Sequence, residues 1–290
     1  MEQLRSLWTD HPFIMSAVVG SMAGHVVFII YRKIRSKASK IPTVDCPPNT
    51  VVLYQWPRGP YAPSASNFPL KLETYLRLAN ISYVNYFSIH RSPKGKVPFI
   101  TYNGELVSDS QFCIEYLNKK LDRDLNKSLT KEERAVAKAI QVMVEEHLYW
   151  VMVYIRWIYD KELKIVTLGV PNVKSSKNAF RRYVHQMLHS QGFGRYTTDE
   201  IVHILLSDLQ ALTDYLGNKP YMMGQTPCEV DCSVFGLLSQ FIWNIADDIC
   251  QNLVQDKFPS LYSYCLRMKE KAWPDWDDCI THGGTRSAPK

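Results

Sequence analysis

The chain lacks the short motifs by which several common catalytic and binding sites are recognised. It contains no glycine-rich phosphate loop, no Ser-His-Asp order typical of a hydrolase, and no basic patch interleaved with aromatic residues. Much of its net charge of +6 lies in one cluster near the N-terminus, and bulk charge says nothing about fold. The sequence therefore gives no sign of a nucleotide-binding enzyme, a serine hydrolase or a nucleic-acid-binding protein.

Disulfide and metal-site spacings are also missing. The seven cysteines are odd in number and show no paired-loop pattern, which favours reduced thiols in a domain that faces the cytosol. His185 and His189 lie one helical turn apart, without the glutamate of a His-Glu-x-x-His pattern or an evident third ligand. Cys228 and Cys232 are also one turn apart, but they do not form a Cys-x-x-Cys pair. We predict no metal centre.

What the chain does have is an ordinary globular composition and one long apolar run. Hydrophobic residues make up 46% and charged residues 21% of 290 residues, enough for about two domains of 100–150 residues. After a tail at 1–12, residues 13–31 are almost all apolar and would span about 28 Å as a helix. A cleaved signal peptide or a buried helix would be the alternatives. The length and the lack of a small-residue cleavage site favour a transmembrane anchor.

The charge around this run predicts its orientation. Only Arg5 precedes it, whereas the linker at 32–49 carries most of the basic residues: Arg32, Lys33, Arg35, Lys37 and Lys40. The positive-inside rule places the large C-terminal part in the cytosol, as a single-pass membrane protein whose membrane is not identified. The same residues would lie against anionic lipid headgroups. Ser16, Gly20 and Gly24 form a small-residue face that could pair two anchors into a dimer.

Residues 50–122 have the pattern of a small α/β domain. We expect strands at 51–56 and 83–89, helices at 68–79 and from about Ser108, and a hairpin of 99–102 and 105–107 about the turn Asn103-Gly104. Pro98 opens the third strand, where a proline fits best, and we expect a cis Val97–Pro98 bond. The connection from 89 to 96 is short. This order of elements predicts a thioredoxin-like sheet.

Residues 129–276 read as helical almost throughout, before a tail at 277–290. Helices are expected from Thr130, where Thr130 and Glu133 resemble a capping box, to about 159, and then at 178–189, 198–216 and 230–245. The aromatic residues near the end of the first helix are interpreted as core packing. Cys228 takes the cap position of the last helix. Asp231 can bond back to the Cys228 N–H, although a cysteine caps more weakly than serine or threonine.

The loop after the first strand is where thiol chemistry would lie in such a fold, and it contains no cysteine. Ser64, Ser66 and Tyr61 are the only candidates there for activating a bound thiolate. Serines in such a run are more often caps and turn formers. Ser108-Asp109-Ser110 leaves hydroxyls and backbone N–H groups at a helix N-terminus, where anions bind well.

The combined pattern resembles the failed axon connections family, a branch of the glutathione-transferase-like proteins related to metaxins. The resemblance is carried by Pro69-Leu70-Lys71-Leu72-Glu73-Thr74, by Lys94-Gly95-Lys96-Val97-Pro98-Phe99, by Ser108-Asp109-Ser110, and by Met222-Met223-Gly224 with Glu229-Val230-Asp231-Cys232. It covers about residues 50–275. It implies an α/β plus all-α architecture, in which a thioredoxin-like domain is followed by a helical domain of the glutathione-transferase type.

This resemblance also implies functional expectations. Glutathione is the implied cofactor, held by Val97, Pro98, Asp109 and Ser110. Members of the family often carry a cysteine where this chain has Pro69, and the transferases carry a further helix between the second and third strands. The family is associated with axon development, and some relatives with a response to cadmium. We therefore keep two hypotheses, a membrane-tethered scaffold with unidentified protein partners and a glutathione-dependent transferase or peroxidase.

Overall fold

The computed structural model describes residues 41–169, 177–244, 252–285 and 287–288. The chain divides into two units, Met1–Thr43 and Val44–Lys290, and every element below belongs to the second. Within the described residues, none of the helices combines the length and apolar character needed to cross a membrane. The predicted span at 13–31, the small-residue face within it and most of the basic linker lie outside the described residues.

A four-stranded mixed sheet forms the first half of the second unit. Its strands are β1 (Val51–Gln55), β2 (Tyr83–Phe87), β3 (Phe99–Tyr102) and β4 (Glu105–Ser108), in the order β2-β1-β3-β4. β1 runs parallel to β2, while β3 is antiparallel to both β1 and β4. This is the thioredoxin-like arrangement that the sequence predicts, and the second strand ends two residues earlier than expected.

The hairpin and the proline step also agree with the prediction. Asn103 and Gly104 both have positive φ, 47° and 84°, as the tight turn between β3 and β4 requires. The Val97–Pro98 peptide is cis, and Pro98 directly precedes β3. One boundary differs, because the helix expected from about Ser108 begins at Ser110. Ser108 pairs with Phe99 as the last residue of β4, and Asp109 is the helix cap.

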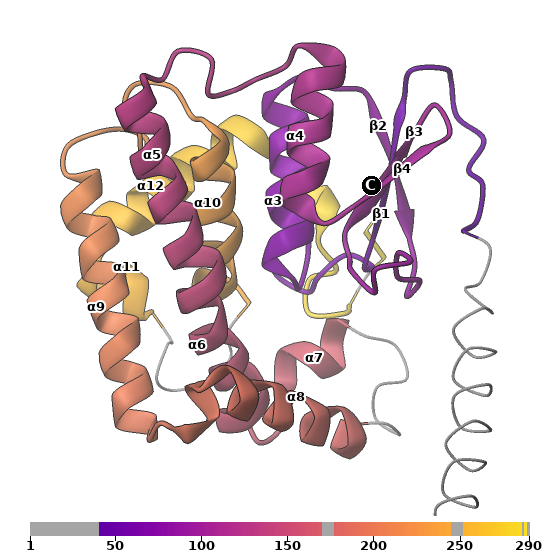
Figure 1. Cartoon of the computed structure of the whole chain (residues 1–290). Coiled ribbons are helices and arrows are strands. Elements are labelled where there is room, and N and C mark those ends of the chain that lie inside the picture. The colour runs from indigo at the N-terminus through magenta and orange to yellow at the C-terminus, as the bar shows by residue number, and fades with distance from the viewer. Residues whose placement is uncertain (1–40, 170–176, 245–251, 286, 289–290) are drawn as a thin grey trace, which may run out of the picture. The chain divides into compact units, whose positions relative to one another are not determined.

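Two helices lie on one face of the sheet, between the sheet and the helical half (Figure 1). They are α3 (Asn67–Leu78) and α4 (Ser110–Leu121). Leu72, Leu76 and Ile114 are fully buried and pack with Leu53 and Ile100 of the sheet. Residues 88–98, between β2 and β3, contain no helix, as the short connection predicts.

The second half is helical. A long first helix is made of α5 (Lys131–Val142), a π-helical segment (Met143–Leu148), α6 (Tyr149–Tyr154) and a second π-helical segment (Ile155–Tyr159). The remaining elements are α7 (Lys164–Gly169), α8 (Lys177–Gln191), a 3₁₀ turn (Phe193–Arg195), α9 (Thr198–Leu216), α10 (Glu229–Ile242), α11 (Leu253–Lys257), α12 (Pro259–Ala272) and a 3₁₀ turn (Trp276–Cys279). The capping box of Thr130 and Glu133 is confirmed, with Glu133 N donating to Thr130 Oγ1 at 3.2 Å.

Helix α10 is the centre of this half and packs directly on α3. Each of its residues from Glu229 to Phe241 is buried. Gly236 allows the close approach, because a Cβ there would lie 2.8 Å from the Asn67 carbonyl oxygen and 3.2 Å from the Lys71 backbone nitrogen. Asp231, fully buried, accepts hydrogen bonds from the backbone N–H groups of Met222 and Cys228, both at 2.8 Å. The predicted bond from the Asp231 carboxylate to the cap is thus confirmed.

A buried ion pair lies between α3 and the loop after β1. The Arg58 guanidinium forms two hydrogen bonds to Glu73, at 2.7 and 2.8 Å, and Gln55 and Asn85 donate to the same carboxylate at 2.7 and 3.0 Å. Burial alone would raise the pKa of Glu73, but the Arg58 charge and these donors outweigh it and lower the pKa below its usual value. Glu73 is therefore a buried anion with its partners in place.

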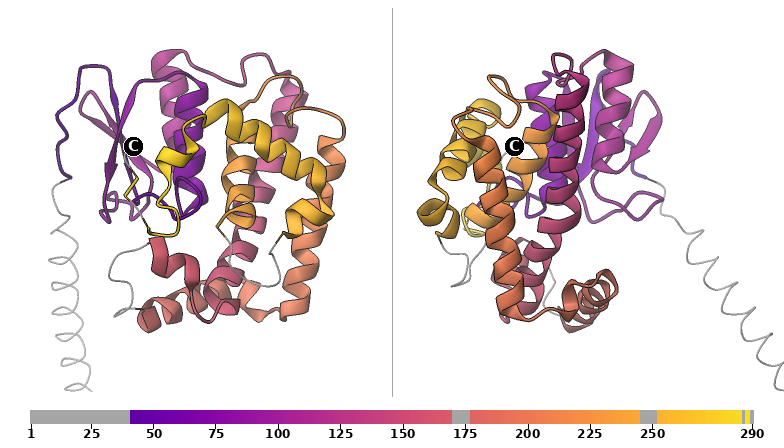
Figure 2. Two further views of the ribbon diagram at one scale, coloured as in Figure 1. Left: turned by 180° about the vertical axis from the view of Figure 1, so that it is seen from behind. Right: turned by 60° about the vertical axis from the view of Figure 1, so that its left-hand side comes forward.

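The last described residues return to the sheet half. We call residues 273–284 the C-terminal strap. Within it, Trp273 Nε1 donates to Thr74 Oγ1 at 2.9 Å, and Thr281 N donates to the Gly59 carbonyl oxygen at 2.9 Å. Thr281, within the segment predicted as a C-terminal tail, is therefore hydrogen-bonded to the loop after β1. Figure 2 shows this yellow segment passing from α12 toward the sheet.

Candidate functional site

The structure brings the predicted glutathione-contacting residues together at one end of the hairpin. Phe99 and Ser108 face each other across β3 and β4, so Val97 and Pro98, which precede β3, lie beside Asp109 and Ser110, which follow β4. The hairpin register produces this adjacency, because each pair directly flanks the same strand positions. We call these four residues the Asp109 edge. A ligand that contains peptide groups could form hydrogen bonds there.

Asp109 has the most unusual backbone at this edge. Its φ of 85° and ψ of 134° lie in a region that side chains other than glycine rarely adopt. Oδ1 accepts from Gln111 N at 3.1 Å, and Oδ2 lies 3.6 Å from Lys96 Nζ. Such strain persists only where surrounding contacts enforce it, and it clusters at functional sites. Ser110 beside it is only 3% exposed.

The loop after β1 holds the three weaker candidates differently. Ser64 is fully buried, and its hydroxyl accepts from Ser66 N at 3.2 Å. Ser66 is the cap of α3 without making a side-chain cap bond, and Tyr61 is 41% exposed. Among the described residues, no hydrogen bond or ion pair joins these three to the Asp109 edge. Ser64 is therefore buried and hydrogen-bonded within the fold. The hydroxyl groups of Ser66 and Tyr61 make no hydrogen bond within the described residues, so they could donate to a ligand.

A buried arginine that the sequence analysis did not single out, Arg156, forms a hydrogen bond to this loop. Arg156 lies in the long first helix and donates to the Ala65 carbonyl oxygen, to Gln240 Oε1 at 3.1 Å and to the Asn244 carbonyl oxygen at 3.2 Å. Burial lowers the pKa of Arg156 to about 10, and no carboxylate within the described residues forms an ion pair with it. The guanidinium therefore fixes the loop through neutral carbonyl groups.

A second buried cation lies under the first turn of α4. Lys71 Nζ donates to Gln111 Oε1 at 2.8 Å and pairs with Glu145, and Gln141 Nε2 donates to Gln111 Oε1 at 2.7 Å. No short sequence pattern indicates a partner for Glu145 or His147, which lie close together in the chain. The structure pairs Glu145 with Lys71, and His147 Nδ1 lies 2.7 Å from Asp208 Oδ2. The contacts of Lys71 and Gln111 join α3, α4 and the long first helix, and Gln111 is the residue after Ser110.

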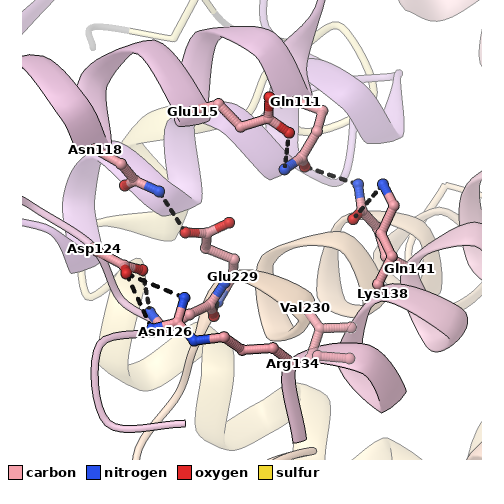
Figure 3. Close-up of a pocket in the computed structure, with 11 residues that line it drawn as sticks. Gln111, Glu115, Asn118, Asp124, Asn126, Arg134, Lys138, Gln141, Glu229 and Val230 are labelled. Atoms are coloured by element: carbon pink, nitrogen blue, oxygen red, sulfur yellow. Dashed lines mark hydrogen bonds and ion pairs between the residues drawn. The ribbon is translucent and has the colours of Figure 1, made fainter. Parts of the chain in front are cut away.

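Next to this network is a polar cavity of about 300 Å³, drawn in Figure 3. Its walls come from α4, from the turn that follows it, from α5 and from the first residues of α10. Most of the lining side chains are polar: Gln111, Glu115, Asn118, Asp124, Asn126, Arg134, Lys138, Gln141 and Glu229. No sequence motif marks this cavity, because its residues come from four separate segments.

The histidine pair and the cysteine pair that the sequence analysis considered as metal ligands are the remaining candidates. Among the residues that the structure describes, no group of three or more His, Cys, Asp or Glu side chains is arranged to hold a metal ion. Both histidines of the predicted pair on α8, His185 and His189, are exposed. Cys228 and Cys232 are buried free thiols, and burial raises the pKa of each. They are therefore poor nucleophiles.

Comparison with known proteins agrees with this architecture. A family described as "Glutathione S-transferase N-terminal domain" matches residues 67–162, and one described as "Glutathione S-transferase, C-terminal domain" matches residues 205–268. Among solved structures, the beta-etherase LigF from Sphingobium superposes with a TM-score of 0.56 at 19% identity, over 81% of this chain and 99% of that chain. The fold and its cis-proline edge thus define a protein of the glutathione-transferase type.

Similarity to individual proteins identifies the family within this class. Failed axon connections of Drosophila melanogaster is 36% identical over 251 residues, which are 80% of this chain and 60% of that protein's length. Isoprene-epoxide–glutathione S-transferase of Rhodococcus is 30% identical over 189 residues, or 62% of this chain and 79% of its own. Metaxin-2 of Mus musculus is 25% identical over 82% of this chain and 94% of its own. The chain belongs to the glutathione-transferase-like family of Failed axon connections and the metaxins.

Proposed function

We propose that this protein is a membrane-anchored member of the family with a non-catalytic scaffold role of the failed axon connections type, acting in axon development. The observation that carries the proposal is the loop after β1. It has no cysteine, Ser64 is fully buried, and the Ser64 carbonyl oxygen accepts from Gln240 Nε2 at 3.2 Å and Asn244 Nδ2 at 3.0 Å. Ser64, one of the three candidates in this loop, is thus used for holding the fold.

The anchor in this proposal is residues 13–31. Their apolar character suits a bilayer, and the basic residues that follow suit the cytosolic leaflet with its anionic lipids. The folded unit would then face the cytosol, where its thiols stay reduced. Protein partners would bind the folded unit, and two anchors could pair through the face of Ser16, Gly20 and Gly24.

A second function, as a glutathione-dependent transferase or peroxidase in detoxification or metal stress, is favoured by a different observation. The cis Val97–Pro98 step and the strained Asp109 beside Ser110 are both present. Strain at Asp109 is a reason to expect a ligand there. One relative is itself described as a glutathione S-transferase. In this alternative, Ser66 or Tyr61 would donate a hydrogen bond to the glutathione thiolate.

Calorimetric titration of the full chain in detergent micelles with glutathione separates the two functions. The scaffold predicts no binding heat at millimolar glutathione and no turnover of chlorodinitrobenzene. The enzyme predicts millimolar or tighter binding that Ser110→Ala abolishes and that Ser263→Ala, a change at an exposed serine of α12, leaves intact. A melting curve for each variant verifies that it is folded.

The anchor is tested separately by extraction of cell membranes. A tagged full chain should stay with the membrane pellet in alkaline carbonate, and replacement of residues 13–31 by a polar segment should release it. Release of the unaltered chain by carbonate would contradict the anchor and leave the scaffold question untouched. The same tagged chain locates the membrane in which the protein resides.

A further inference from the structure

The polar cavity beside α4 is lined by charged side chains, of which Glu229 and Lys138 form no ion pair within the described residues. Glu229 at the start of α10 is only 9% exposed. Its carboxylate accepts from Asn118 Nδ2 at 2.6 Å, and among the described residues no cation forms an ion pair with it. Figure 3 shows this carboxylate directed into the space between α4 and the turn at Asp124. A buried anion without a counter-ion is costly, so it favours a cationic ligand group.

The carboxylates around Glu229 strengthen this preference. Burial raises the pKa of Glu229 and the negative charge of Asp124 adds to that rise, whereas the bond from Asn118 and the positive charge of Lys71 oppose it. Asp124 is itself paired, since Arg134 Nη2 lies 3.2 Å from its Oδ2. Glu115 also lines the cavity. An ammonium group placed here would be attracted by three carboxylates and would relieve the repulsion between two of them.

The wall formed by α5 carries positively charged side chains. Lys138 Nζ makes one contact within the described residues, to Gln141 Oε1 at 3.3 Å, and pairs with no carboxylate there. Arg134, one turn earlier on the same helix, adds a second positive charge. The cavity therefore presents to the same space a carboxylate from α10 and an ammonium group from α5, neither of which forms an ion pair within the described residues.

We propose that this cavity binds a free α-amino acid, with the ammonium group at Glu229 and the carboxylate at Lys138. The volume of about 300 Å³ lies at the lower end of the range for ligand pockets, which suits a ligand of this size. A diamine would place its second ammonium against Lys138, and a dicarboxylate would place its second carboxylate against Glu229. The polar lining favours an amino acid with a polar side chain.

L-glutamine and two molecules that each lack one of its charged groups test the pairing of charges. Glutaramate lacks the ammonium group, and 4-aminobutanamide lacks the carboxylate. In calorimetry with the full chain in micelles, L-glutamine should bind, and each of the other two should bind about tenfold or more weakly. Equal binding of 4-aminobutanamide, or no binding of L-glutamine at 10 mM (roughly the weak limit of the method), would overturn the proposal.

Variants locate the site. Glu229→Gln keeps the acceptor for Asn118 but removes the charge, and Lys138→Gln changes an exposed side chain that the fold does not need; each should weaken L-glutamine binding about tenfold. Glu132→Gln is the matched control on the exposed surface of α5 and should leave binding unchanged. Unchanged binding in Lys138→Gln and in folded Glu229→Gln would refute the assignment. Ser110→Ala should not affect L-glutamine, which distinguishes this site from the glutathione edge.

Discussion

Asp231→Asn tests the role of the buried carboxylate that organises the start of α10. In the wild-type chain, Oδ1 accepts from Met222 N at 2.8 Å and from the Tyr264 hydroxyl at 3.1 Å, and Oδ2 accepts from Cys228 N at 2.8 Å. Asparagine has nearly the same shape but only one acceptor oxygen. If that oxygen faces Met222, the amide NH₂ faces the Cys228 N–H, and two donors oppose each other in a buried site.

The magnitude follows from these bonds. A buried N–H left without an acceptor costs about 1–3 kcal/mol, and each bond that changes from a charged to a neutral acceptor loses about 1 kcal/mol. Burial raises the pKa of Asp231, so the charge is held at a cost that asparagine removes. We expect a net loss of about 2–4 kcal/mol in the free energy of unfolding, or about 4–16 °C in Tm for a chain of this size.

Thermal unfolding of the full chain in micelles, followed by circular dichroism, measures this loss. Asp199→Asn is the matched control, because Asp199 also lies in the first turn of a helix, α9, but is exposed. Its cost should stay below about 1 kcal/mol. Cys228→Ser should have the opposite sign and stabilise by about 0.5–1 kcal/mol, since serine is a better cap. If Asp231→Asn melted with the control, the carboxylate would not be what holds the start of α10.

Three further predictions concern α3 and the loop after β1 with the groups that contact them. The folded pKa of Glu73 lies below its usual value of 4.5, so the stabilisation that its ionised form provides is complete above about pH 4.5 and is lost as the pH falls through the folded pKa. As the pH is lowered to about 3, the urea midpoint of Glu73→Gln should therefore fall less steeply than that of the wild-type chain. Gly236→Ala should destabilise by about 1–3 kcal/mol, seen as a lower urea midpoint, because its methyl group meets the Asn67 carbonyl oxygen. Arg156→Gln should leave the Ala65 carbonyl unbonded and speed proteolysis in the loop after β1, while a wild-type cleavage rate would contradict the role of Arg156.

Local signals explain what the sequence could predict. The Asn103-Gly104 turn and the adjacent strands determine the hairpin, and the hairpin register alone brings Pro98 next to Asp109. Helix α9 has the predicted bounds because a capping box at Thr197 starts it and Gly217 ends it. Asp231 could be matched to its cap because the two residues are only three positions apart.

Contacts between distant residues explain what could not be predicted. Lys71 and Glu145 are 74 positions apart, and Arg156 and Ala65 are 91 apart, so no short pattern signals either contact. Lys71 lies between two leucines and looks like an ordinary exposed position of an amphipathic helix until α4 and the long helix cover it. The cavity at Glu229 has the same origin, because its opposing charges meet only after α4, α5 and α10 have packed.

The C-terminal strap joins one of the last described parts of the chain to one of the first. Thr281 bonds to Gly59, which was synthesised 222 positions earlier, and this bond crosses from the helical half to the sheet half. The sheet half therefore emerges first from the ribosome but must wait for the last segment of the chain before its loop is closed. Because the strap connects the two halves, calorimetry of the protein is expected to show one endotherm for both of them.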